Sequence, residues 1–353
     1  MSRATDLASA RVRAIAGYTP GEQPTDRHLV KLNTNENPYP CSPLVVETIE
    51  AEAHRLHLYP SPMSDPLREK AAQVYGVRPS QILVGNGSDE LLAILLRACT
   101  DPGDKVAYAV PTYSLYRTLT ELVGAIPVEV AADGSAAIPA GLKGSGARIT
   151  FLCTPNSPTG RCVSPGAIAA FAREASGVVV VDETYIDFGG ATAIPLLAAH
   201  ANVVVTRTFS KSFSLAGLRL GLLFGNEEFL AELAKVKDSY NVSRLAVAAG
   251  VAALEDIAWM HSNVARIRAT RARVTAALRR LGFGVEDSSA NFIFVDCASR
   301  GGGRAVYDLL REGGVLVRFF DSPVLQRGVR VSIGTDEQMD RMLGLLAQPA
   351  GAA

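Results

Sequence analysis

Two ionisable residues stand at or just after the ends of apolar runs that are predicted to be buried strands, where catalytic side chains are often found. Asp182 follows four consecutive valines, Val178 to Val181, so its carboxylate is expected at the carboxyl edge of a parallel strand. Lys211 follows the apolar run Val203 to Thr206 by a few residues. A lysine in a cleft, with a lowered pKa, can form a Schiff base with a carbonyl. A carboxylate beside an apolar strand costs desolvation energy unless a positive group pairs with it.

A possible phosphate site accompanies the lysine. Arg219 comes eight residues after Lys211. The hydroxyl residues Thr208 and Ser210 come just before Lys211. Hydroxyl groups and a guanidinium together can hold a phosphate. The plainer alternatives are an aspartate that caps a turn and a lysine on a solvated loop.

The elements that must position these residues alternate between short apolar runs and amphipathic helical patterns. Strands are predicted at 82–84, 105–110, 126–130, 149–153, 178–182, 203–206 and 220–224, and helices at 42–57, 64–76, 88–99, 163–176, 193–199 and 226–238. Continuously apolar strands are typical of a sheet that is covered on both faces. The pattern therefore predicts a large, doubly wound, mostly parallel α/β domain over residues 30–245.

The remaining chain predicts a smaller α+β domain over residues 246–353, with an N-terminal arm at 1–29. One long helical pattern runs over 242–281 and is expected to bridge the two domains. Beyond it the sequence predicts strands at 292–295, 315–318 and 329–333 and helices near 303–312 and 335–347. A cleft between two such domains is the default place for a binding site.

Composition excludes several classes of function. The 353 residues are 48% hydrophobic, more than one core usually absorbs. The 35 basic residues balance 35 acidic ones, so the broad charge of a nucleic-acid or anionic-membrane binder is missing. Apolar runs are too short to cross a bilayer, and the N-terminus lacks a signal-peptide core. We expect a cytoplasmic protein that binds neither nucleic acid nor membrane.

Neither a metal site nor a disulfide framework is indicated. The five cysteines contain no C-x-x-C pair and are scattered, at Cys41, Cys99, Cys153, Cys162 and Cys297. His54 and His57 have the spacing of metal ligands on a helix but lack suitable further ligands, so solvated side chains are expected.

Eight motifs, in order along the chain, carry a family resemblance. They are NTNENPY from Asn33, GNGSDE from Gly85, PTY from Pro111, TPNSPTG from Thr154, DETY from Asp182, SK to RLG from Ser210 to Gly221, ANF from Ala290 and RVSIG from Arg330. Together, over residues 30 to 345, they resemble the fold type I aminotransferases of class I/II that use pyridoxal 5′-phosphate. The first two motifs resemble the histidinol-phosphate aminotransferase branch.

The resemblance implies roles around the cofactor ring. Lys211 would hold the cofactor as a Schiff base and later move a proton. Asp182 would pair with the ring nitrogen and keep it protonated. Tyr185 and Asn156 would hydrogen-bond the ring's 3′-oxygen, and Tyr113 would stack on the ring.

It also implies a phosphate cup that two subunits share. The cofactor phosphate would bind at the helix N-terminus that Ser88 and Asp89 open, where backbone N–H groups favour an anion. Ser210 and Arg219 would close the cup. Tyr59 would reach in from a second subunit, so the resemblance implies a homodimer.

On the substrate side, Arg330 would bind an anionic group, because a guanidinium fork bonds carboxylate and phosphate oxygens alike. Tyr18 would contact the substrate phosphate. Asn35, Tyr240 and Arg318 are further substrate-binding candidates.

The implied activity is transamination of L-histidinol phosphate with 2-oxoglutarate to imidazole acetol phosphate and L-glutamate, in histidine biosynthesis. An aminotransferase for phenylalanine or tyrosine and a decarboxylase for an amino-acid phosphate stay open as alternatives. From other classes, a dinucleotide-binding turn at 85–87 lacks its third glycine, since Glu90 stands there. A non-catalytic binding module would not need Lys211.

Overall fold

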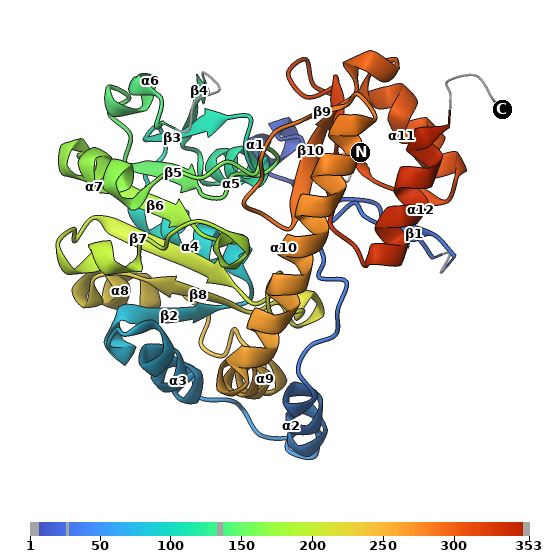
Figure 1. The fold of residues 1–353 in the computed structure, drawn as a ribbon. Helices are drawn as coiled ribbons and strands as arrows, with labels where there is room; N and C mark the ends of the chain where they lie inside the picture. The colour runs from blue at the N-terminus through green and yellow to red at the C-terminus, as the bar shows by residue number, and fades with distance from the viewer. Residues whose placement is uncertain (1–6, 26–27, 133–136, 349–353) are drawn as a thin grey trace.

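A seven-stranded sheet forms the centre of the larger part of the molecule (Figure 1), with strand order β2-β8-β7-β6-β5-β3-β4. The structure is a computed structural model that describes residues 7–25, 28–132 and 137–348. The strands are β2 (Ile82–Gly85), β3 (Lys105–Val110), β4 (Ile126–Ala131), β5 (Ile149–Cys153), β6 (Val178–Asp182), β7 (Val203–Thr208) and β8 (Gly221–Phe224). Strand β8 is antiparallel to both its neighbours, and the other pairs are parallel. The predicted mostly parallel sheet is confirmed.

Helices cover both faces of this sheet, which explains why its inner strands are mostly apolar on both faces. Val180 and Val204 pack into the core beneath α4 (Ser88–Cys99), α5 (Leu115–Val123) and α8 (Glu227–Ala234). Val179 and Val205, one residue away along each strand, pack into the core beneath α3 (Asp65–Tyr75), α7 (Pro165–Glu174) and α9 (Arg244–Glu255). Successive side chains of a strand point to opposite faces, so both sets are buried.

A smaller antiparallel sheet has the order β12-β13-β10-β9. Its strands are β9 (Gly284–Val285), β10 (Phe292–Asp296), β12 (Arg318–Phe319) and β13 (Gly328–Ser332), and α11 (Gly302–Glu312) and α12 (Asp336–Ala347) accompany it. Strand β1 (Val30–Lys31) pairs in parallel with β11 (Val315–Leu316). The expected single strand at 315–318 is thus two short strands with different partners. The domain boundaries at 29 and 245 stay a proposal.

The long helical pattern over 242–281 is two helices, so the expectation of one continuous helix was wrong. Helix α9 ends at Glu255 and α10 (Ile257–Arg280) follows, with Asp256 between them in a non-helical conformation at φ −105° and ψ 48°. The Asp256 carboxylate accepts a hydrogen bond from Ser42 Oγ at 2.5 Å, next to α2 (Pro43–Ala53). Helix α10 alone reaches from the large sheet to the small one (Figure 1).

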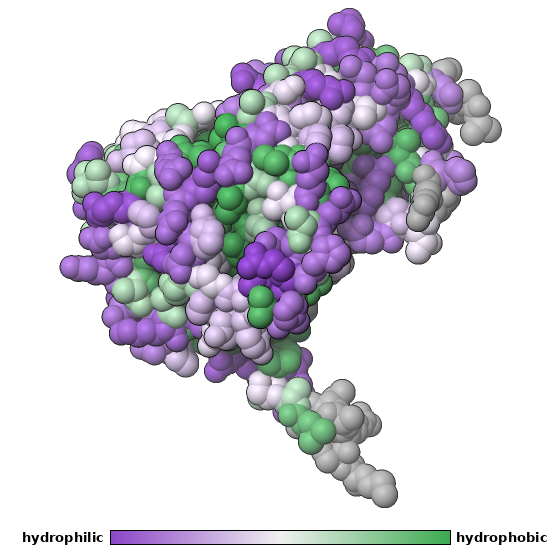
Figure 2. Space-filling model, turned by 90° about the horizontal axis from the view of Figure 1, so that it is seen from below, coloured by the Kyte–Doolittle hydropathy of each residue, from purple (hydrophilic) through white to green (hydrophobic). Residues whose placement is uncertain are grey.

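The other short elements are α1 (Ala10–Ala14), α6 (Ala140–Lys143) and 3₁₀ helices at Pro79–Gln81, Ile186–Phe188, Ile194–Ala198, Ala216–Leu218 and Ala298–Arg300. The helix expected at 193–199 is therefore a 3₁₀ helix. Figure 2 shows a face on which hydrophilic residues predominate and hydrophobic ones form scattered patches. No helix in the described part of the chain is long and apolar enough to cross a membrane.

Candidate active site

A cavity of about 650 Å³ opens where the carboxyl ends of the large sheet meet the small sheet. Twelve of the residues singled out in the sequence line it: Tyr18, Asn35, Ser88, Asp89, Tyr113, Asp182, Tyr185, Ser210, Lys211, Arg219, Arg318 and Arg330. They come from the N-terminal arm, the start of α4, the strands β12 and β13, and the segments at or just after the ends of β1, β3, β6 and β7 and before β8. The structure thus brings together residues that are up to 312 positions apart in the chain, from Tyr18 to Arg330.

Asp182 is a buried carboxylate at the end of β6, 2% exposed. It accepts hydrogen bonds from the backbone and hydroxyl of Thr184, at 3.1 and 2.6 Å, and from Tyr116 OH at 2.6 Å. Burial raises the pKa of Asp182, while these donors act in the opposite direction. A carboxylate held in this way is suited to pair with a cationic group that enters the cavity.

Lys211 carries the cavity's amine. Its Nζ donates to the carbonyl oxygen of Thr34 at 3.1 Å. Burial, with the nearby charge of Arg330, lowers the pKa of Lys211 to about 8. A substantial fraction of the amine is therefore neutral and nucleophilic near physiological pH.

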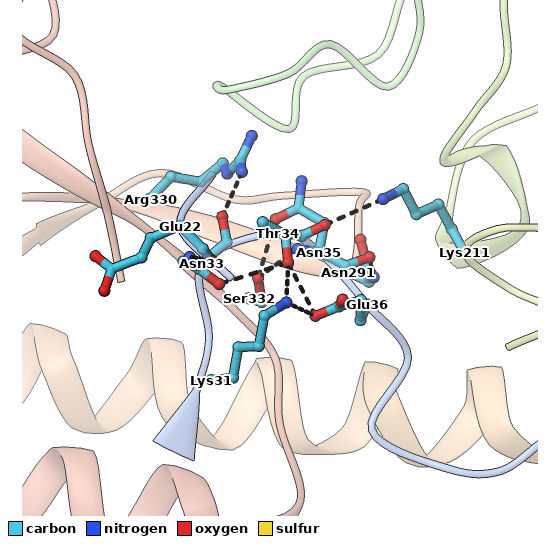
Figure 3. A network of polar contacts seen from close by, with 10 residues as sticks. All are labelled: Glu22, Lys31, Asn33, Thr34, Asn35, Glu36, Lys211, Asn291, Arg330 and Ser332. Atoms are coloured by element: carbon cyan, nitrogen blue, oxygen red, sulfur yellow. Dashed lines mark hydrogen bonds and ion pairs between the residues drawn. The ribbon is translucent and has the colours of Figure 1, made fainter. Parts of the chain in front are cut away.

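The segment 33–37 crosses between the lysine and the arginine of the small sheet (Figure 3). Asn33 O accepts from Arg330 at 2.8 Å, and Asn35 Nδ2 donates to Tyr185 OH at 3.0 Å. Asn37 Nδ2 donates to the backbone carbonyl of Lys211 at 3.2 Å. One short segment therefore contacts an amine, a phenol and a guanidinium that different elements supply. Burial raises the pKa of Tyr185 to about 12, so the phenol keeps its proton.

Two more bonds fix the segment itself. The backbone N–H of Asn35, which has a left-handed φ of 56°, donates to Ser332 Oγ at 2.8 Å. Asn291 Nδ2 donates to Asn35 O at 2.9 Å. Lys31, Thr34 and Glu36 form a polar cluster on the neighbouring side (Figure 3).

Arg330 is a half-buried cation with spare donors. Its two terminal nitrogens donate to Ser157 Oγ at 3.0 Å and to Asn33 O at 2.8 Å, while its buried Nε has no partner. Among the residues that the structure describes, no carboxylate forms an ion pair with it, and burial lowers its pKa. Buried charges are usually paired, so this site is suited to bind an anion.

Arg318 lies directly across from Arg330 in the β12–β13 pair, so both side chains are on the same face. Its nitrogens donate to the carbonyl oxygens of Pro20 at 3.1 Å and Thr19 at 3.0 Å. Arg318 therefore holds the N-terminal arm against the cavity. Next to these carbonyls, Tyr18 lies edge-on to Tyr113 with ring centroids 5.9 Å apart.

The opposite end of the cavity carries the donors expected to hold a phosphate. Arg219 donates to Ser210 Oγ at 3.2 Å and pairs with Asp89 Oδ2 at 3.2 Å. Gly87, with φ 86°, precedes α4, and a Cβ there would lie 2.8 Å from the Arg219 guanidinium. Glycine thus lets the arginine lie close to the helix N-terminus, where free N–H groups favour an anion.

Three expected site residues do not line the cavity. Asn156 lies behind its wall, with its amide donating to Pro111 O at 3.0 Å and accepting from Thr112 Oγ1 at 2.7 Å. The other two are Tyr59 and Tyr240. Tyr59 is 77% exposed, and the two rings stack with centroids 4.5 Å apart.

Sequence reasoning missed several residues that the site depends on. Tyr116 was missed although it follows Tyr113 by three positions, which is the spacing of one helix face. Thr34 takes part through its backbone carbonyl, which no side-chain pattern can reveal. Ser157, which contacts Arg330, stands inside the motif TPNSPTG.

Comparisons with known proteins define the class. The model of the family described as aminotransferase class I and II matches residues 27–346. The chain belongs to this family. The predicted fold type I aminotransferase fold, with its large mostly parallel sheet and smaller C-terminal sheet, is confirmed.

Its similar relatives are histidinol-phosphate aminotransferases. That of Citrifermentans bemidjiense is 46% identical over 340 residues, 96% of this chain and 97% of the relative. That of Trichormus variabilis is 42% identical over 337 residues, 95% of this chain and 96% of the relative. The solved histidinol-phosphate aminotransferase of Sinorhizobium meliloti, in complex with pyridoxal 5′-phosphate, is 25% identical with a TM-score of 0.87 and covers 97% of this chain and 96% of its own.

The residues of the cavity fit pyridoxal 5′-phosphate. Lys211 supplies an amine of lowered pKa for the aldehyde, and Asp182 supplies a buried carboxylate for the ring nitrogen. The cradle of Gly87, Ser210 and Arg219 supplies donors for the phosphate. Each part of the cofactor therefore has a chemically suitable partner in one cavity.

Proposed function

We propose that the protein is a pyridoxal-phosphate-dependent aminotransferase. It converts L-histidinol phosphate and 2-oxoglutarate to imidazole acetol phosphate and L-glutamate, a step of histidine biosynthesis. The observation that carries the proposal is the juxtaposition, in one cavity, of the Lys211 amine with the half-buried guanidinium of Arg330, whose Nε has no partner and which pairs with no carboxylate among the described residues. The names of relatives up to 46% identical over nearly the whole chain support the substrate.

When bound, pyridoxal phosphate supplies a carbonyl that condenses with amines and a protonated ring that accepts the electrons of a carbanion. Lys211 takes the proton from the substrate Cα and returns it, because its amine is partly neutral near pH 8. Asp182 would favour the protonated form of the ring nitrogen, because its buried carboxylate carries a negative charge. Ser210, Arg219 and the N-terminus of α4 bind the cofactor phosphate.

The same anion site serves both substrates. Histidinol phosphate carries a phosphate ester and no α-carboxylate, whereas glutamate and 2-oxoglutarate carry carboxylates. Arg330 and its cross-strand neighbour Arg318 place two guanidinium groups on one face of the small sheet. A guanidinium bonds oxygens of either group, so one site can accept both. Tyr18 adds a phenol at the arm side of the cavity.

The enzyme is a cytoplasmic homodimer in this proposal. Tyr59 is exposed and lies outside its own chain's cavity, as expected of a residue that completes the cavity of a second copy. Leu56 and Leu58, next to it in the chain, are also exposed. Burying such apolar side chains favours association. All five cysteines are free thiols, which suits a reducing compartment.

Parallel steady-state assays test the substrate. The purified protein is supplied with 2-oxoglutarate and with histidinol phosphate, phenylalanine or tyrosine, and L-glutamate formation is followed. We expect the highest kcat/KM with histidinol phosphate and no turnover in Lys211→Ala. Higher kcat/KM with the aromatic amino acids would assign the site to them instead. Release of carbon dioxide from an amino-acid phosphate, without glutamate, would indicate a decarboxylase.

A further inference from the structure

The two oxygens of Asp182 have unequal surroundings. Oδ1 accepts from the backbone and hydroxyl of Thr184, at 3.1 and 2.6 Å, and from Thr206 Oγ1 at 3.4 Å. Oδ2 accepts from the hydroxyl of Tyr116 at 2.6 Å, its one hydrogen bond within the described residues. Oδ2 therefore keeps acceptor capacity for a further donor, and its existing bond comes from a single side chain.

Tyr116 reaches this oxygen from inside the core. Its side chain is fully buried on α5, and it is not among the residues that line the cavity. The ring stacks on Phe151, with centroids 4.5 Å apart and an interplanar angle of 10°. Tyr113 lies edge-on to it with centroids 5.6 Å apart, and Tyr108 is tilted against it at 5.9 Å. A ring held on two sides cannot swing away, so the position of its hydroxyl is fixed.

We propose that Tyr116 is a positioning residue that holds the Asp182 carboxylate, in its charged form, ready to pair with the ring nitrogen of the cofactor. This inference rests on the proposed function, because it needs pyridoxal phosphate in the cavity. Tyr116 touches neither cofactor nor substrate and acts through Asp182.

The physical reason is the balance of charge at Asp182. Burial disfavours a carboxylate, and each hydrogen bond donated to it favours the charged form. Without the phenol, Oδ2 loses its protein donor and the carboxylate loses the bond that limits its rotation on that side. A neutral or misoriented acid pairs poorly with a protonated ring nitrogen, so both cofactor affinity and electron withdrawal by the ring decrease.

The test compares two phenylalanine variants. Tyr116→Phe removes the hydroxyl that contacts Asp182 but keeps the stacked ring. Tyr108→Phe is the matched control: Tyr108 is also buried, its ring lies 5.9 Å from that of Tyr116, and its hydroxyl donates to Glu129 at 3.1 Å instead. The dissociation constant of pyridoxal phosphate is measured by absorbance titration of protein stripped of cofactor. Thermal unfolding of the stripped protein reports the purely structural effect of each change.

We expect Tyr116→Phe to weaken cofactor binding by about ten-fold, the typical effect of one hydrogen bond to a charged group. The glutamate half-reaction should slow as well, and the absorbance of the bound cofactor should shift. Tyr108→Phe should change the dissociation constant by less than about two-fold, since it leaves every bond of Asp182 in place.

A double-mutant cycle shows whether the effect passes through Asp182. In an Asp182→Asn background, Tyr116→Phe should cause no additional loss of affinity. The inference about Tyr116 would be overturned if Tyr116→Phe and wild type bound pyridoxal phosphate equally, or if Tyr116→Phe caused its full loss of affinity in the Asp182→Asn background. Either result would leave the proposed function intact. A wild-type protein that does not bind pyridoxal phosphate would overturn the proposed function, and this inference with it.

Discussion

Replacing Arg330 by methionine should greatly lower kcat/KM while changing the free energy of unfolding only slightly. The arginine contributes a half-buried charge, one buried Nε without a partner and two terminal nitrogens that could each reach an anion. Losing one side of a buried, hydrogen-bonded charge pair costs about 2–5 kcal/mol. The expected decrease in kcat/KM is therefore about 30-fold to 4,000-fold in both half-reactions, at about 1.4 kcal/mol per factor of ten.

Stability should respond differently. Without substrate, Arg330→Met removes the hydrogen bonds to Ser157 and Asn33, which lowers the free energy of unfolding by about 1 kcal/mol each. The same change removes a positive charge that has no acidic partner among the described residues, which raises the free energy of unfolding. These effects oppose one another, so Arg330→Met should change the free energy of unfolding by only about 1 kcal/mol.

Arg318→Met is the matched control in the same cavity. Its nitrogens bind the carbonyls of Thr19 and Pro20, so this change should loosen the arm and raise KM with a smaller effect on kcat. Single-turnover kinetics of each half-reaction and urea unfolding measure the two effects. Near-normal turnover of Arg330→Met would refute the assignment of Arg330 to the anion site, and equal losses in both variants would show that Arg318 binds the anion as strongly as Arg330 does.

Four further outcomes follow from the site. Lys211→Ala should keep its fold by circular dichroism and lose turnover by several orders of magnitude, and retained activity would remove the basis of the mechanism. Only the neutral amine attacks an aldehyde, so the rate at which stripped protein captures pyridoxal phosphate should rise with pH and level off above the lowered Lys211 pKa of about 8; a rise that continues past pH 10 would contradict the lowered pKa. Tyr18→Phe should raise KM for histidinol phosphate more than for glutamate, and an equal effect on both would show that the phenol does not read the phosphate. Sedimentation should give a dimer, and Tyr59→Ala should weaken cofactor binding; an active monomer would disprove the shared cup.

Much of the fold was predictable because most strands of the large sheet are short, mainly apolar runs, two of which begin with three or four consecutive valines. The expected bounds of β3, β5 and β6 agree with the structure at both ends. Helix α5 was not predicted, because its nine residues include two threonines and a valine, whose branched side chains weaken helical preference. The break at Asp256 could not be predicted because no proline or glycine marks it, and the contact of its carboxylate with Ser42 joins residues more than 200 positions apart.

Within the site, the sequence could indicate several of the residues that line the cavity, but not the hydrogen-bond partners of their side chains. Asp182 and Lys211 could be selected because each follows a buried strand, and the sheet edge then brings them together. The position of Asn156 behind the cavity wall depends on side-chain bonds to Pro111 and Thr112. Such bonds are made only after the loops have packed, so the sequence carries no local signal of them.

The two arginines of the small sheet support a functional rather than a structural role for the proposed anion site. Like charges at directly opposite positions of an antiparallel pair destabilise a sheet, and Arg318 and Arg330 occupy such positions. Arg318 lowers the pKa of Arg330 further, after burial has already done so. A protein selected for stability alone would place an acid or an apolar side chain at one of these positions. An anionic substrate removes the conflict, because it supplies the negative charge that the fold withholds.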